Sequence, residues 1–136
     1  MHTTNYHNTL IEIADDCPVA TAEVPPERGS SPTVARRQYE MLIEHPYRFT
    51  SDDLIFTIHA DRNGIPESDR QVERERFFSK GQPCLRTSHL ARRYGWGLHH
   101  DAEGRVALVP AGSEEYQRLA SDPTITRVKA MRSKRG

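Results

Sequence analysis

The residue types that could do chemistry are concentrated between Arg74 and Asp101. This segment, RERFFSKGQPCLRTSHLARRYGWGLHHD, holds one of the two cysteines, the single tryptophan and three of the seven histidines. Cys84 has basic neighbours on both sides, which favour a reactive thiolate. His99, His100 or His89 could act as its base if the fold brings one of them near. One hypothesis is therefore a small enzyme with Cys84 as nucleophile; the alternative is a small buried apolar cysteine.

The same segment carries six Arg and Lys side chains. Arginine presents a bidentate fork that matches phosphate, and a helix beginning near Ser88 would add backbone donors. Our first hypothesis is thus that this segment binds a phosphate-bearing small molecule, with nucleic acid as a further possible partner. The alternative is a solvated helical face on which Glu73 and Glu75 pair with arginines. The residues expected to bind the ligand are Arg76, Lys80, Arg86, Arg92, Arg93 and Trp96.

The tryptophan and the paired histidines each have two interpretations. Trp96 and Tyr94 could stack on a base or ring, or Trp96 could anchor the core. Neighbouring strand residues point to opposite faces, so His99 and Asp101 could share a face as two metal ligands, which by themselves do not make a site. The alternative is that His100 packs on the face of Trp96 while His99 faces solvent. The sequence contains neither HExxH nor CxxC, so we expect no metal and no cofactor.

Charge is distributed unevenly along a chain whose formal net charge is zero. Residues 1–69 carry 12 acidic and 5 basic residues, and residues 70–136 carry 7 acidic and 14 basic residues. The halves could neutralise each other within the fold, or they could pair between subunits in an assembly protein. The basic tail at 132–136 could contact nucleic acid, although no known readout motif accompanies it.

The chain has no apolar run long enough to span a membrane and no signal-peptide pattern near its start. We therefore expect a cytoplasmic protein that binds no membrane. In that compartment Cys17 and Cys84 are expected to be reduced thiols.

The elements that must position these residues alternate between strands and helices. Caps at Ser31, Ser68 and Ser113 predict helix starts, while Asp52 and Asp53 suggest turn or cap chemistry. The order predicts an α+β fold with a small, mainly antiparallel sheet and three to four helices in one domain, 1–136. Residues 15–32 form an irregular proline-rich connection. We expect strands over 5–14, 54–60, 96–100, 105–110 and 124–131, and helices over 32–45, 68–80, 88–94 and 113–120.

Several blocks of the sequence resemble a known family. HTTNY, CPVATAEVPP, TSDDLIF, RERFFSKGQPCLR, RYGWG, EEY and VKAMRSKR together look like a family of small microbial proteins catalogued as a domain of unknown function. The resemblance covers nearly the whole chain and is most specific from Arg76 to Gly97. It implies a cytoplasmic domain of its own type and assigns no chemistry.

Overall fold

The computed structural model describes residues 1–27 and 29–134, and within them it contains one four-stranded sheet and five α-helices. The strands are β1 (Thr9–Glu12), β2 (Trp96–His100), β3 (Val106–Pro110) and β4 (Thr126–Lys129). The helices are α1 (Val34–Glu44), α2 (Ser51–Arg62), α3 (Arg70–Phe77), α4 (His89–Arg92) and α5 (Glu114–Ala120). Two short 3-10 helices are η1 (Glu67–Asp69) and η2 (Leu85–Thr87).

The sheet is mixed, with the strand order β3-β2-β1-β4. β2 pairs antiparallel with both β1 and β3, whereas β4 pairs parallel with β1. The hairpin between β2 and β3 turns at Gly104, whose φ of 80° suits glycine. The Asp101 carboxylate accepts the backbone N–H of Glu103 and of Arg105 there, each at 2.9 Å. The predicted α+β class is confirmed, and the strands expected over 96–100 and 105–110 form this hairpin.

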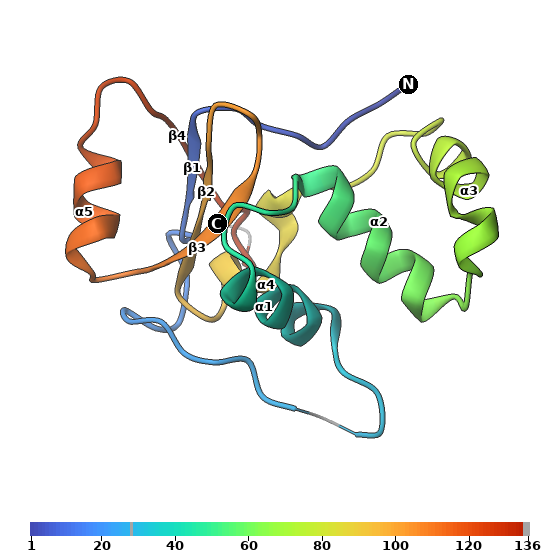
Figure 1. Cartoon of the computed structure of the whole chain (residues 1–136). Helices are drawn as coiled ribbons and strands as arrows, with labels where there is room; N and C mark the ends of the chain where they lie inside the picture. The colour runs from blue at the N-terminus through green and yellow to red at the C-terminus, as the bar shows by residue number, and fades with distance from the viewer. Residues whose placement is uncertain (28, 135–136) are drawn as a thin grey trace.

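Helices cover both faces of the sheet (Figure 1). On one face, α5 packs over a small cluster that includes Leu10, Val109 and Leu119. On the other, α1, α2 and α4 enclose the main core, in which Leu98 and Leu54 are fully buried. α3 lies beyond α2, on the side away from the sheet.

The largest departure from expectation is residues 54–60, predicted as a strand and found within α2. Thr50 and Asp53 form a reciprocal capping box, each side chain accepting the other's backbone N–H at 3.1 Å. The run is apolar on several sides because α2 lies between two clusters. Leu54 faces the main core, while Phe56 packs in a separate cluster with Phe78 next to α3. A helix buried on several sides loses the one-sided periodicity that identifies helices, so the predicted strand was wrong and one helix was missed.

Two predicted caps were also wrong. The α1 N-cap is Thr33 rather than Ser31, because the Thr33 hydroxyl accepts the Arg36 N–H at 3.2 Å. Ser68 lies in η1, and α3 begins without a side-chain cap. The predicted cap at Ser113 is confirmed, with its hydroxyl accepting the Tyr116 N–H at 3.1 Å.

The first and last strands are shorter than predicted, at four residues each. Asn8, which precedes β1, has a φ of 47° and so interrupts the extended backbone. None of the helices in the described part of the chain is long and apolar enough to cross a membrane.

Candidate functional site

A groove surrounds the N-terminal half of α1 and consists of three adjoining hollows, which we call together the α1 groove. The first, the anion pocket, has a volume of about 380 Å³ and is lined by Thr33, Val34, Ala35, His89, Arg93 and Tyr94. The second, of about 150 Å³, is lined by Val34, Ala35, Gln38, Thr87, Ser88 and His89. The third, the ring cleft, measures about 220 Å³ and is lined by Val34, Gln38, Ile55, Ile58, His59, Arg62, Asn63 and Phe77.

The side chains of Ser88 and Gln38 hold α4 against α1 at the centre of this groove. The Ser88 hydroxyl caps α4 by accepting the Leu90 N–H at 3.2 Å. The same hydroxyl donates to the Gln38 Oε1 atom at 2.6 Å. Both polar side chains are buried, so this contact fixes the position of His89 and Arg93 relative to the start of α1.

The anion pocket has a positive character. None of its six lining residues is acidic, and Arg93 is exposed beside His89. Burial, more than the charges of Arg93 and Arg92, lowers the pKa of His89. The backbone N–H groups of Val34 and Ala35 in the first turn of α1 have no acceptor within the described part of the chain. A helix N-terminus, an arginine and a histidine that can become protonated form a set suited to an anion.

The structure separates the predicted ligand-binding residues. Arg93 lines the anion pocket, and Arg92 lies close enough for its charge to act on His89. Arg76 is exposed on α3 and pairs with Glu73 at 2.8 Å. Three others lie elsewhere: Lys80 is exposed after α3, the Arg86 Nε–H donates to the Lys129 carbonyl at 2.7 Å, and Trp96 is buried.

Trp96 occupies the core side of the sheet. Its indole N–H donates to the Glu23 carbonyl at 2.8 Å, and its ring lies 5.5 Å from the ring of Tyr39. Only 8% of its surface is exposed, so its ring is not available as a stacking platform in this conformation.

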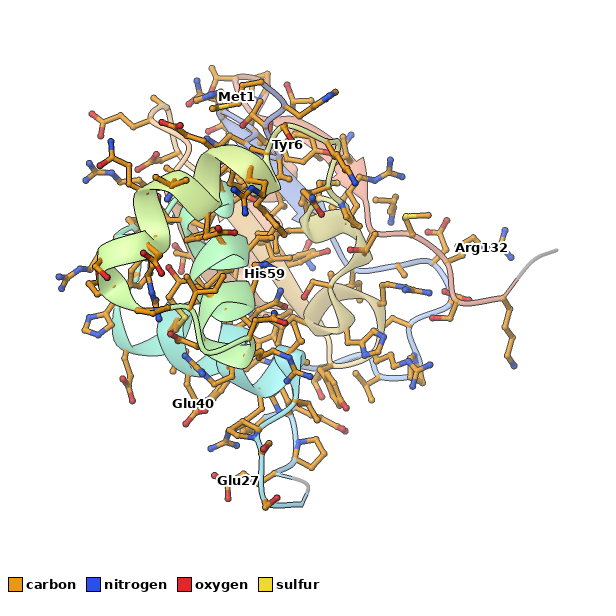
Figure 2. All side chains as sticks on the ribbon, turned by 90° about the vertical axis from the view of Figure 1, so that its right-hand side faces the viewer. Met1, Tyr6, Glu27, Glu40, His59 and Arg132 are labelled. Carbon is orange, nitrogen blue, oxygen red and sulfur yellow. The ribbon has the colours of Figure 1, made fainter. Side chains whose placement is uncertain are left out.

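Cys84 contacts a tyrosine rather than a histidine. Its sulfur lies 3.2 Å from the Tyr6 hydroxyl, on a half-buried site. Burial, together with the contact to Cys84, raises the pKa of Tyr6 to about 12. Among the described residues neither His99 nor His100 has a recorded hydrogen bond to this thiol. Figure 2 labels Tyr6 well apart from His59, so the thiol site and the ring cleft are separate places.

The two strand histidines have different surroundings: His100 is buried as expected, whereas His99 is half-buried and does not simply face solvent. His100 is fully buried, its Nδ1 lies 3.1 Å from the Leu98 carbonyl, and its ring packs edge-on against Tyr6. Burial lowers its pKa to about 4. His99 is half-buried, and its Nδ1 lies 2.8 Å from the Tyr47 hydroxyl.

The basic C-terminal segment is attached to the 15–32 connection. The Asp16 carboxylate accepts the backbone N–H groups of Ser133 and Lys134, at 2.9 and 2.8 Å. These hydrogen bonds hold the pKa of Asp16 below its ordinary value. The last two residues of the predicted tail lie outside the described residues.

The acidic and basic halves pair with each other inside the chain. Four ion pairs between described residues join the halves: Asp53 with Arg74 at 2.9 Å, Asp61 with Arg70 at 2.9 Å, Glu67 with Arg70 at 3.6 Å, and Asp15 with Lys129 at 3.3 Å. Part of the charge asymmetry is therefore neutralised without a second subunit. Within the described ranges no group of three or more His, Cys, Asp or Glu side chains could hold a metal ion.

The analysis of the sequence missed Gln38 and Tyr6. Gln38 falls at i+3 from Ala35 and at i−4 from Leu42, both buried, so a polar residue on the core-facing stripe of α1 was the available signal. Tyr6 carried no comparable signal, because its contact with Cys84 joins positions 78 residues apart.

Fold and groove together define a small α+β protein with a ligand-sized groove between its helices. A family model matches residues 1–136, and the chain belongs to that family, the family of unknown function DUF6157. Neither a search of curated proteins nor a search of solved structures finds a match.

Proposed function

We propose that this protein binds a small phosphate-bearing ligand in the α1 groove, with the anionic group in the anion pocket. The observation that carries the proposal is the convergence of Arg93, His89 and the open first turn of α1 on one hollow of about 380 Å³. Of the predicted ligand-binding residues, Arg93 is the one that lines this hollow.

Each component contributes a different interaction. The N–H groups of Val34 and Ala35 point along the positive end of the α1 dipole, which favours a negative charge. The exposed Arg93 guanidinium can approach phosphate in a bidentate geometry. Because burial lowers the pKa of His89, its ring is neutral in the free protein and gains a proton more easily once an anion is bound.

A titration with inorganic phosphate, followed by backbone amide NMR shifts, tests this proposal. We expect the largest shifts at Val34, Ala35 and His89, with Arg93→Ala weakening binding at least about tenfold. Arg76→Ala is the matched control, because this exposed arginine lies on α3, outside the groove, and pairs with Glu73. Equal losses in both variants, or shifts confined to the C-terminal segment, would overturn the proposal.

A second candidate function is thiol chemistry at Cys84, which the Tyr6 contact favours. Because the raised pKa of Tyr6 keeps its phenol protonated, its O–H can donate to a sulfur anion. In a Cys17→Ser background, Tyr6→Phe should then slow alkylation of Cys84 several-fold near neutral pH. An unchanged or faster rate would leave the tyrosine as a packing partner only.

We also propose a cytoplasmic location in a microbial cell. Both cysteines are free thiols, which suits a reducing compartment. Oxidation of the protein to a disulfide form on isolation without reductant would count against this location. Nucleic-acid binding has less support, because the C-terminal segment is held by Asp16.

A further inference from the structure

The amide of Gln38 has an unused hydrogen-bond donor facing the α1 groove. Only 6% of this residue is exposed, yet it lines both the ring cleft and the middle hollow. Its Oε1 accepts from Ser88, and its Nε2 has no partner in the described part of the chain. The Nε2 atom is not fully enclosed, so it remains accessible to a ligand in the groove.

The orientation of this amide is fixed by its neighbours. The Ser88 hydroxyl accepts the Leu90 N–H and donates its proton to the Gln38 Oε1 atom, so the oxygen of this amide faces Ser88. The NH₂ group therefore points the other way, toward the groove. An acceptor on a ligand in the groove would complete the hydrogen bonding of this amide.

The ring cleft next to this amide is lined by four apolar side chains and by the polar side chains of His59, Arg62 and Asn63. Ile55 and Ile58 come from α2 and Val34 from α1, and the Phe77 ring closes the side toward α3. The His59 ring stacks on Phe77 with a centroid distance of 4.4 Å and an interplanar angle of 34°. Figure 2 looks onto this side of the molecule, with His59 of α2 labelled beneath α3.

The size of the cleft suits a single ring system. An apolar cavity of about 150 Å³ accommodates benzene, and this cleft measures about 220 Å³. The anion pocket adjoins it through residues on the same helix. Ala35 lines the anion pocket and Gln38 lines the cleft, three residues or about 4.5 Å apart along the axis of α1.

We propose that the ligand of the α1 groove is an aromatic anion with the build of a mononucleotide. Its flat heterocycle lies in the ring cleft against Phe77 and accepts a hydrogen bond from the Gln38 amide. Its phosphate lies in the anion pocket beside Arg93, about one helical turn away. This inference rests on the proposed function and adds the class of ligand; it involves no bond-making step.

Three probes separate the two parts of the groove: inorganic phosphate, uridine and uridine 5′-monophosphate. The readout is the NMR spectrum, in which the side-chain NH₂ of Gln38 gives its own pair of signals. We expect uridine monophosphate to bind at least about tenfold more tightly than phosphate and to shift the Gln38 NH₂ signals. We expect uridine to shift the Gln38 and Phe77 signals but not those of Arg93.

Two variants of Gln38 test the hydrogen bond itself. Gln38→Met removes the donor at similar volume, and Gln38→Glu keeps the acceptor for Ser88 while replacing the donor. Both should weaken uridine binding at least about tenfold. The matched control is Gln117→Met, an exposed position on α5 on the opposite face of the sheet.

The outcomes distinguish the two proposals. Phosphate binding at Arg93 with no gain for uridine monophosphate, or with full uridine affinity in Gln38→Glu, would overturn the ring inference and leave the proposed function standing. Failure of phosphate to bind, with uridine bound in the cleft, would overturn the anion pocket alone. Failure of all three probes would overturn both.

Discussion

Thr4 donates two hydrogen bonds to one carboxylate oxygen of Asp52, from its backbone N–H and from its hydroxyl, each at 2.7 Å. The other Asp52 oxygen accepts the Thr3 hydroxyl at 2.6 Å. Asn5 completes the contact by accepting the Asp52 backbone N–H at 2.9 Å. The N-terminal segment is thereby fastened to the first turn of α2, the helix that forms one wall of the ring cleft.

Replacing Asp52 should therefore be costly. Asp52→Ala removes three hydrogen bonds and leaves the buried Thr4 N–H without an acceptor, so we expect a loss of about 3 kcal/mol in the free energy of unfolding. Denaturant unfolding measures this loss. Asp69→Ala is the control, because Asp69 precedes α3 without a capping hydrogen bond and should change stability by less than about 0.5 kcal/mol. Equal losses in both variants would contradict the prediction.

Stability should fall in acid because of His100. Its pKa is about 4 in the folded protein, against 6.5 for an ordinary histidine, so the unfolded chain binds more protons between these values. The contribution is fully present above about pH 6.5 and is lost as the pH falls toward 4, by about 3 kcal/mol in all.

Unfolding curves of the wild type and of His100→Gln across this pH range check the effect. The variant should be less stable near neutral pH, and the gap should narrow as the solution is acidified. His2→Gln, at an exposed histidine, is the control: its free energy of unfolding should change with pH in the same way as that of the wild type. A gap between wild type and His100→Gln that is independent of pH would rule out His100 as the source.

The titration of His89 should respond to ligand. Burial and the neighbouring arginines lower its pKa in the free protein, and a bound phosphate supplies the opposite charge. Following the ring protons of His89 by NMR, we expect saturating phosphate to raise its pKa toward the ordinary value. An identical titration of His89 with and without phosphate would place the anion elsewhere.

Position 97 must be glycine because the Tyr116 ring packs directly against it on the α5 face of the sheet. A Cβ atom at this position would lie 2.7 Å from the Tyr116 ring, whose hydroxyl accepts the Ile13 N–H at 3.0 Å. Gly97→Ala should therefore displace Tyr116 and lower the free energy of unfolding by about 2 kcal/mol. Gly81→Ala is the control, since the nearest atom to a Cβ there is 3.8 Å away. Thermal unfolding compares the two, and similar melting temperatures would contradict this packing.

Sequence patterns predicted the elements whose signals are local. The turn between β2 and β3, the short helix expected near Ser88 and the predicted cap at Ser113 all depend on residues within four positions of each other. The strand predicted over 54–60 was wrong for a reason that is not local. Because α2 packs against both the main core and α3, its apolar residues lie on several sides of the helix and hide the helical period.

The candidate site was predictable only in part, for the same reason. Arg93 was identified because arginines cluster in its segment, but the surface it shares with Val34 and Ala35 depends on the packing of α4 against α1. The contact between Gln38 and Ser88 spans 50 positions of the chain. Neither composition nor spacing specifies such a pairing.

The parallel pairing of β1 with β4 has a consequence for biosynthesis. Thr9 and Thr126 are register partners although 117 positions separate them. While the chain is being translated, β1 therefore leaves the ribosome long before its neighbour exists, and one edge of it carries unpaired backbone groups throughout. We expect nascent chains that end before β4 to need a chaperone or to self-associate through this edge, since contacts this distant form late in folding.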